Sequence, residues 1–169
     1  MPVSRQDLFD YLDKLNIAHN TLNHDPIFRV EDSLELKAQR PGANTKNLFL
    51  KDKAGKFFLI CAQSDTNIRI NKLHPILGCK RLSFGKTDPL LEFLGVTPGS
   101  VTLFSILNDT ESAVTLILDA ALMNHDIVNF HPLLNDATTA ISSADMIKFA
   151  KATGHNPVIL DFAELSEKD

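Results

Sequence analysis

Three short segments carry the groups that could perform chemistry on a small substrate. The segment 41–50, PGANTKNLFL, places the polar residues 45–47 at the entry to an apolar stretch. The segment 95–102, GVTPGSVT, contains two glycines, which let backbone N–H groups approach a ligand closely. The segment 129–133, NFHPL, places a histidine after another apolar run. If the fold brings them together, a cation, amide donors and an imidazole would surround one cleft, which suits polarising an ester and binding its oxyanion.

Each of these residues also has an ordinary structural explanation. Lys46 could be a surface lysine at a strand end, and Asn47 could cap a turn. His131 could be a packed strand-end residue, and His24, which precedes an Asp-Pro pair, could belong to a turn. The two glycines of segment 95–102 are equally typical of turns. The residue types alone leave both explanations open.

Several familiar catalytic motifs are absent from the sequence. It contains no G-x-x-x-x-G-K-[ST], G-x-G-x-x-G, H-E-x-x-H or G-x-S-x-G pattern, which removes the usual support for ATP hydrolysis, dinucleotide redox chemistry, zinc proteolysis and serine hydrolysis. Cys61 and Cys79 are too few for a disulfide framework and have no neighbouring histidine, so we expect structural thiols. The histidines at 24, 125 and 131 lack the tight spacing of metal ligands, so no metal is expected.

Charge is distributed unevenly along a chain whose net charge is -4. Between Lys37 and Lys86 there are eleven basic residues against two acids, so this segment carries +9 and the remainder carries -13. Such asymmetry can create a local positive face that attracts phosphates, although a solvated lysine-rich surface has the same composition.

Hydrophobic spacing and turn residues predict a mixed sheet with helices packed around it. We expect helices over residues 5–15, 31–38 and 89–94, and another that Ser142 or Ser143 caps and Gly154 ends. Strands are expected over residues 18–22, 47–50, 57–62, 82–84, 114–118 and 127–130, and from 157 onward. Ser4 and Asp7 predict a capping box, while Asp88 and Gly95 predict the two caps of the third helix. Residues 51–56 should form a hairpin loop, and strand 127–130 should lie beside strand 114–118.

Length and hydropathy predict one domain over residues 1–169. No apolar run approaches the ~18 residues that a membrane span needs. The N-terminus, MPVSRQDLFDYLDKL, is charged and lacks the apolar core of a signal peptide, so a cytoplasmic protein is expected.

As a set, the PGANTKNLFLKD, GVTPGSVT and NFHPL segments resemble the free-standing prolyl-tRNA deacylases, of the ProXp-ala type, in the YbaK-like superfamily. This superfamily also includes the editing (insertion) domain of bacterial prolyl-tRNA synthetases. The resemblance runs from the N-terminal helix to about residue 162. Arg29 and Leu103 depart from the residues common in the family. The implied fold is α/β (α+β), with a mixed, partly barrel-like sheet surrounded by helices.

The resemblance implies trans-editing, in which the ester of alanine on proline tRNA is hydrolysed by water. A proline pocket cannot strongly reject the smaller alanine, because a few apolar groups are worth only ~1–3 kcal/mol. By resemblance, Lys46, Asn47, Gly95 and Gly99 would form the catalytic site, and His24, Thr45, Ser100 and His131 would bind substrate.

The resemblance implies no cofactor and no covalent nucleophile. The expected partner is the acceptor end of mischarged tRNA, with prolyl-tRNA synthetase as a further candidate partner. Two other functions remain open at this point: removal of cysteine or another small residue from tRNA, and non-catalytic binding of tRNA or of a synthetase.

Overall fold

The structure is a computed structural model that describes residues 2–25 and 42–162. The helix expected over residues 31–38 and the departure at Arg29 lie outside these residues. The part of the chain that the structure describes contains no helix long and apolar enough to cross a membrane.

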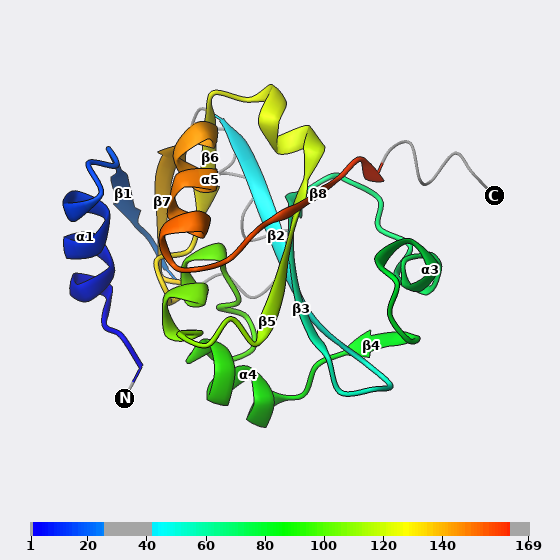
Figure 1. The fold of residues 1–169 in the computed structure, drawn as a ribbon. Coiled ribbons are helices and arrows are strands. Elements are labelled where there is room, and N and C mark those ends of the chain that lie inside the picture. The colour runs from blue at the N-terminus through cyan, green and yellow to red at the C-terminus, as the bar shows by residue number, and fades with distance from the viewer. Residues whose placement is uncertain (1, 26–41, 163–169) are drawn as a thin grey trace.

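A mixed eight-stranded sheet forms the centre of the molecule (Figure 1), which confirms the predicted fold class. The strands follow the order β1-β7-β6-β2-β3-β5-β8, and β4 pairs with β2. Neighbours are antiparallel in the β2–β3, β2–β4, β6–β7 and β1–β7 pairs, and parallel in the β2–β6, β3–β5 and β5–β8 pairs. The strands are β1 (Asn20–Asn23), β2 (Ala43–Asp52), β3 (Phe57–Gln63), β4 (Leu82–Phe84), β5 (Val114–Asp119), β6 (Ile127–Phe130), β7 (Ala137–Ser142) and β8 (Val158–Leu160).

Helices cover the sheet at several places (Figure 1). The α-helices are α1 (Arg5–Lys14), α3 (His74–Leu77), α4 (Thr87–Leu94) and α5 (Ser143–Ala152), and the short 3₁₀ helices are η1 (Ile70–Lys72), η2 (Leu103–Asn108) and η3 (Ala120–Asn124). Helix α1 lies near β1 at one side of the molecule, and α3 lies at the opposite side.

The helix caps follow the sequence signals in most cases. Ser4 and Asp7 form the predicted capping box of α1, and Ser142 caps α5 by accepting a hydrogen bond from the N–H of Asp145. Gly95 ends α4 in the left-handed conformation, as predicted. The expectation that Asp88 caps α4 is wrong, because the helix begins two residues earlier than expected, at Thr87, and Lys86 occupies the cap position. Asp88 instead lies in the first turn, where a carboxylate favours the positive end of the helix dipole.

The β2–β3 hairpin is longer than predicted. Both strands extend beyond the apolar runs, and their turn is held by the carboxylate of Asp52, which is only 2% exposed. Asp52 accepts hydrogen bonds from the N–H groups of Ala54, Lys56 and Lys80. The buried carboxylate therefore joins the hairpin turn to the chain that enters β4.

The expected pairing of strand 127–130 with strand 114–118 is wrong. Strand β5 lies between β3 and β8, whereas β6 lies between β2 and β7. The apolar residues of β5 suit burial between two parallel neighbours, and the η3 segment carries the chain from β5 to a distant position in the sheet. Strand β7 was not expected, because its residues ATTAIS are weakly apolar, although they alternate between buried and half-buried positions.

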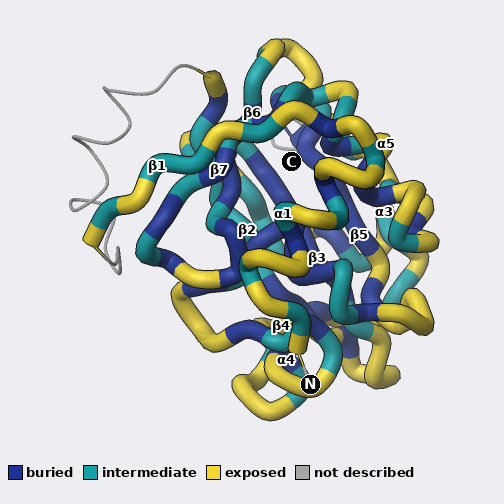
Figure 2. Tube along the Cα trace, turned by 90° about the vertical axis from the view of Figure 1, so that its left-hand side faces the viewer, coloured by how far each residue is buried: buried dark blue, intermediate teal, exposed yellow. Residues whose placement is uncertain are grey.

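Two hydrophobic cores lie on opposite faces of the β2–β3 hairpin. Phe49, Leu59 and Cys61 contribute to the larger core, with residues of α1, α4, η2 and α5. Leu50, Phe58 and Ile60 contribute to the smaller one, with Leu73 beside α3, Leu82 of β4 and Phe162. Both faces of the hairpin are consequently covered, and Figure 2 shows the buried course of these central strands. Side-chain alternation then decides which core each residue of β2 faces.

Candidate active site

Lys46 lies on β2 opposite Ala62 of β3, on the strand face that carries Leu48 and the smaller core. The side chain is half-buried, and its Nζ donates a hydrogen bond to the backbone carbonyl of Thr66. Within residues 2–25 and 42–162, the ion pairs are Arg5–Asp136, His19–Asp13 and His155–Asp109, and none of them involves Lys46. The ammonium is thus oriented by a neutral carbonyl and has no carboxylate partner among these residues.

Thr45 and Asn47 face the other side of β2. Asn47 pairs with Cys61 of the larger core, and its Nδ2 lies 3.4 Å from the hydroxyl oxygen of Thr45. Thr45 donates that hydroxyl to the carbonyl of Asn129 at 2.7 Å, which links β2 to β6. The Oδ1 atom of Asn47 is buried and accepts no hydrogen bond from any residue that the structure describes. The amide of Asn47 therefore lies on the opposite face of β2 from the Lys46 side chain.

His24 and His131 lie close to each other at the loop between β6 and β7. His24 donates from Nδ1 to the carbonyl of Asp25, and its Nε2 lies 2.8 Å from the hydroxyl of Thr138. His131 donates from Nδ1 to the carbonyl of Ala137 at 3.2 Å. Burial lowers the pKa of His131, and this hydrogen bond opposes part of the effect, while the nearby His24 and Arg5 charges lower the pKa further. At neutral pH the imidazole of His131 is consequently neutral.

Arg5 anchors the loop that carries His131. Sequence reasoning did not predict this role of Arg5. Its guanidinium donates to the carbonyls of Pro132 and Leu134 and forms an ion pair with Asp136. A helix near the N-terminus thereby fixes a loop more than 120 residues further along the chain. The contact depends on tertiary folding alone, so no local motif signals it.

Gly95, Gly99 and Ser100 lie in the connection between α4 and η2. Gly95 has φ of +68°, and a Cβ at this position would lie 2.7 Å from Nδ2 of Asn108. Gly99 has φ of +90°, and the N–H of the buried Ser100 donates to the carbonyl of Thr97. Both glycines therefore adopt the positive φ values that are typical of turn glycines. Gly95 also permits Asn108 to approach the helix end closely.

Sequence reasoning also missed Asp119, at the end of β5. Its carboxylate is 1% exposed and accepts hydrogen bonds from the N–H of Gln63, from the hydroxyl of Thr66 and from the N–H of Ala121. The available signal was an aspartate at the end of an apolar strand, just before a turn. Its partner Thr66 is 53 positions away along the chain, so no local pattern connects the two residues.

The two cysteines are free thiols, as expected. Cys61 is completely buried, and burial raises the pKa of its thiol far above the ordinary value. Such a group is neither ionised nor accessible at neutral pH, so it cannot attack a substrate. Among the residues with described positions, no three His, Cys, Asp or Glu side chains come together as a metal site would require.

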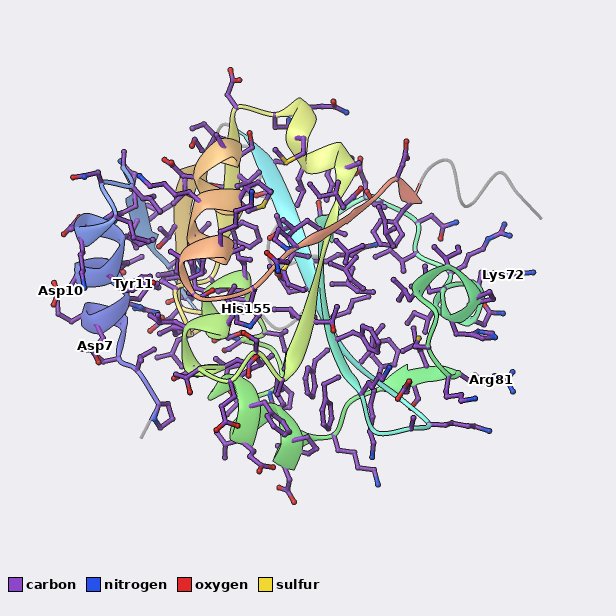
Figure 3. All side chains as sticks on the ribbon, viewed as in Figure 1. Asp7, Asp10, Tyr11, Lys72, Arg81 and His155 are labelled. Atoms are coloured by element: carbon purple, nitrogen blue, oxygen red, sulfur yellow. The ribbon has the colours of Figure 1, made fainter. Side chains whose placement is uncertain are left out.

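Exposed basic side chains gather on the hairpin turn and around α3, at the end of the molecule opposite α1. Figure 3 shows Lys72 and Arg81 at this end, while Asp7 and Asp10 project from α1 on the other side. The exposed basic residues of this region include Lys51, Lys53, Lys56, Lys72, Lys80 and Arg81. Part of the basic segment of the sequence thus forms one basic end of the folded molecule.

The fold and these residues define an α/β domain with an oriented lysine on a central strand of a mixed sheet. The family model of the aminoacyl-tRNA editing domain matches residues 24–149. This chain therefore belongs to the aminoacyl-tRNA editing domain family, as the resemblance of its motifs indicated.

Individual relatives agree with this assignment. The chain is 38% identical to a zebrafish (Danio rerio) prolyl-tRNA synthetase associated domain-containing protein 1, over 94% of this chain and 87% of that protein. It is 33% identical to the prolyl-tRNA editing protein ProX of Acetoanaerobium sticklandii, over 90% of this chain and 93% of the relative. A solved structure described as a candidate trans-editing enzyme for prolyl tRNA synthetase matches with a TM-score of 0.70 and 14% identity, covering 95% of this chain and 97% of its own. At that identity the match shows a shared fold.

Proposed function

We propose that residues 1–169 form one editing domain that hydrolyses alanine from mischarged Ala-tRNA(Pro) in trans. The family assignment supports aminoacyl-tRNA as the substrate class, and the name of the relative ProX supports proline tRNA. The single observation that carries the proposal is Lys46: a half-buried ammonium on a central strand, oriented by a backbone carbonyl and without a carboxylate partner among the described residues.

In the proposed reaction, water attacks the carbonyl carbon of the aminoacyl ester. Negative charge develops on the carbonyl oxygen, and the Lys46 ammonium neutralises that charge or contacts the terminal adenosine. Attack by water agrees with the burial of Cys61, which leaves that thiol unable to form an acyl-enzyme. A ribose hydroxyl of the substrate assists the proton transfer. The backbone of Asn47 and the loop that contains Gly95, Gly99 and Ser100 orient the ester.

Of the remaining proposed residues, His24 and His131 line the pocket, each held by a hydrogen bond to β7 or to its start. Thr45 lies on the opposite face of β2 from Lys46, and its hydroxyl holds β2 to β6 beside the pocket. The neutral imidazole of His131 can orient the attacking water, since Nδ1 donates to the carbonyl of Ala137 and Nε2 has no hydrogen-bond partner among the described residues. Selection by size requires apolar pocket walls that admit a methyl group and exclude the proline ring.

The basic end of the molecule is suited to the acceptor stem of the tRNA. Leu48, two residues after Lys46, packs in the same core as Leu73, which lies between η1 and α3. The face of β2 that presents Lys46 is therefore the face covered by the segment that carries Lys72. Phosphates bound there would place the 3′ end of the tRNA near Lys46. Prolyl-tRNA synthetase would supply the mischarged tRNA.

Hydrolysis of three substrates tests the proposal: Ala-tRNA(Pro), Pro-tRNA(Pro) and Cys-tRNA(Pro), at fixed salt. The wild-type protein should deacylate the alanine substrate selectively, and Lys46→Ala should lower kcat by about 100-fold, the loss typical of removing one stabilising group from an oxyanion site. Lys14→Ala is the control, because Lys14 is an exposed lysine of α1, at the opposite side of the molecule from the basic end. Its kcat should stay within about twofold of wild type, since no transition-state contact is lost.

The other outcomes identify the alternatives. Selective deacylation of Cys-tRNA(Pro) would show that this editing domain removes cysteine rather than alanine. If the protein binds tRNA but hydrolyses none of the three substrates, it is a non-catalytic tRNA-binding module and the proposal is wrong. Accumulation of an acyl-enzyme would contradict direct attack by water.

A further inference from the structure

A chain of hydrogen bonds connects Asp119, at the end of β5, to Lys46 on β2. The hydroxyl of Thr66 donates to Oδ2 of Asp119 at 2.6 Å, and the backbone carbonyl of Thr66 accepts from the Lys46 ammonium. The hydroxyl and the carbonyl belong to one residue, so restraining the first restrains the second. A hydroxyl donated to an ionised carboxylate is among the stronger hydrogen bonds in proteins.

The turn that contains Thr66 is held at both ends. The N–H of Gln63 donates to the same Oδ2 atom of Asp119 at 3.0 Å, and the N–H of Thr66 closes the turn by donating to the carbonyl of Gln63 at 2.9 Å. Ser64 adds a backbone hydrogen bond to the carbonyl of Asn44. The carbonyl that faces Lys46 thus belongs to a turn anchored to both β2 and β5.

The two oxygens of Asp119 serve different neighbours. Oδ1 accepts from the N–H of Ala121 and caps η3, whereas Oδ2 holds the turn. Capping a short helix needs one oxygen and does not require a carboxylate that is 1% exposed. Burying such a charge is unfavourable unless several donors surround it. Here two of its three donors belong to the turn beside Lys46.

We infer that Asp119, acting through Thr66, is a positioning residue for the Lys46 ammonium. The inference rests on the proposed function, in which Lys46 meets the charge that develops on the ester. Asp119 touches neither substrate nor Lys46. It fixes the carbonyl that orients the lysine. Its own carboxylate accepts hydrogen bonds from two backbone N–H groups and one hydroxyl, and it forms no ion pair with the ammonium. Lys46 is therefore oriented without being neutralised.

Thr66→Val separates this role from the capping role of Asp119. The substitution removes the hydroxyl, keeps the branched shape and leaves the bond between Oδ1 and Ala121 intact. We expect kcat on the alanine substrate to fall about tenfold while KM stays within about twofold, because a misplaced catalytic group slows the chemical step without weakening tRNA binding. Thr66→Ser restores the hydroxyl and should restore kcat. Thr153→Val is the control: it removes another threonine hydroxyl, one that donates to the backbone carbonyl of Ala150 and lies 3.0 Å from Nδ1 of His155, at the end of α5.

A second measurement reports the lysine directly. Reductive methylation with ¹³C-formaldehyde keeps the positive charge and labels each lysine, and comparison with Lys46→Arg assigns the Lys46 signal. That signal should shift in Thr66→Val, return in Thr66→Ser and remain unchanged in Thr153→Val. If Thr66→Val does not fold, Thr66→Ala removes the same hydroxyl and is measured instead.

The two readouts distinguish the possible failures. A wild-type protein without turnover would refute the proposed function, and the Lys46 signal alone would then decide the positioning role. Normal kcat in Thr66→Val, or a fall in kcat with an unshifted Lys46 signal, would overturn the inference. Equal effects of Thr66→Val and Thr153→Val would also overturn it, since they would indicate a general loss of stability.

Discussion

Replacing Gly95 by alanine should destabilise the protein more than replacing Gly78 does. Both glycines end helices in the left-handed conformation, with φ of +68° and +67°. They differ in their surroundings: a Cβ on Gly78 meets nothing within 4 Å, whereas a Cβ on Gly95 lies 2.7 Å from Nδ2 of Asn108 and 3.0 Å from Cβ of Pro2. The pair therefore separates backbone strain from steric conflict.

The structure provides the expected magnitude of each effect. A left-handed conformation costs a residue with a Cβ about 1–2 kcal/mol, which applies to both substitutions. At Gly95 the side chain of Asn108 must also move, and it donates to the carbonyl of Leu94 at 2.9 Å and accepts from the N–H of Val3 at 2.8 Å. Losing two such hydrogen bonds costs about 1–3 kcal/mol in addition. We expect Gly78→Ala to lower the free energy of unfolding by about 1–2 kcal/mol and Gly95→Ala by about 2–5 kcal/mol.

Urea unfolding followed by circular dichroism measures both losses. The transitions are compared through their midpoints with a shared slope, since neither substitution changes the surface exposed on unfolding. Equal losses for the two variants would refute the steric argument. A loss at Gly95 below about 1 kcal/mol would refute the strain argument as well.

Three further predictions concern the thiols, the basic end and the buried imidazole. A thiol reagent should modify Cys79 in the native protein, while Cys61 should react only after denaturation, because it is completely buried. Arg81→Ala should weaken tRNA binding and reduce the slope of log K against log salt by about one, whereas Lys14→Ala on α1 should change neither, as binding titrations at several salt concentrations can measure. Burial lowers the pKa of His131 in the folded state, so the unfolded state binds its proton more readily and the free energy of unfolding should fall as the pH decreases through about 6.5. His131→Gln should flatten this dependence in urea titrations between about pH 7.5 and about pH 5.5, each about one unit from the ordinary pKa of histidine. An unchanged slope would contradict the assignment.

Local sequence signals predicted several helix ends and most strands of this fold. The capping box at Ser4 and Asp7 and the left-handed glycine at the end of α4 depend on residues a few positions apart, so their geometry follows from the sequence. The order of strands in the sheet depends on contacts across the whole chain. Strands β5 and β6 are consecutive and apolar, yet each finds its partners elsewhere. No pattern within either strand distinguishes these arrangements.

The sequence also did not predict which face of the sheet carries Lys46. Alternation along β2 requires Lys46 and Asn47 to face opposite sides, and that much follows from a strand assignment. In most sheets an apolar face and a polar face would then show which side is buried. Here Phe49 faces one core and Leu50 faces another, so the strand is apolar on both sides and its pattern does not say which core Lys46 borders.

The register of the hairpin resolves this ambiguity. Pairing Lys46 with Ala62 brings the lysine to the start of the turn at residues 63–66, and the parallel β3–β5 pairing brings Asp119 to the same turn. A shift of one residue in the β2–β3 pairing would place Asn47 at that position and turn Lys46 toward the larger core. The orientation of the ammonium is therefore a property of strand register, which the anchored turn and the buried carboxylate of Asp119 together help to fix. Substitutions that loosen the register should impair Lys46 even when they leave every residue of the candidate site unchanged.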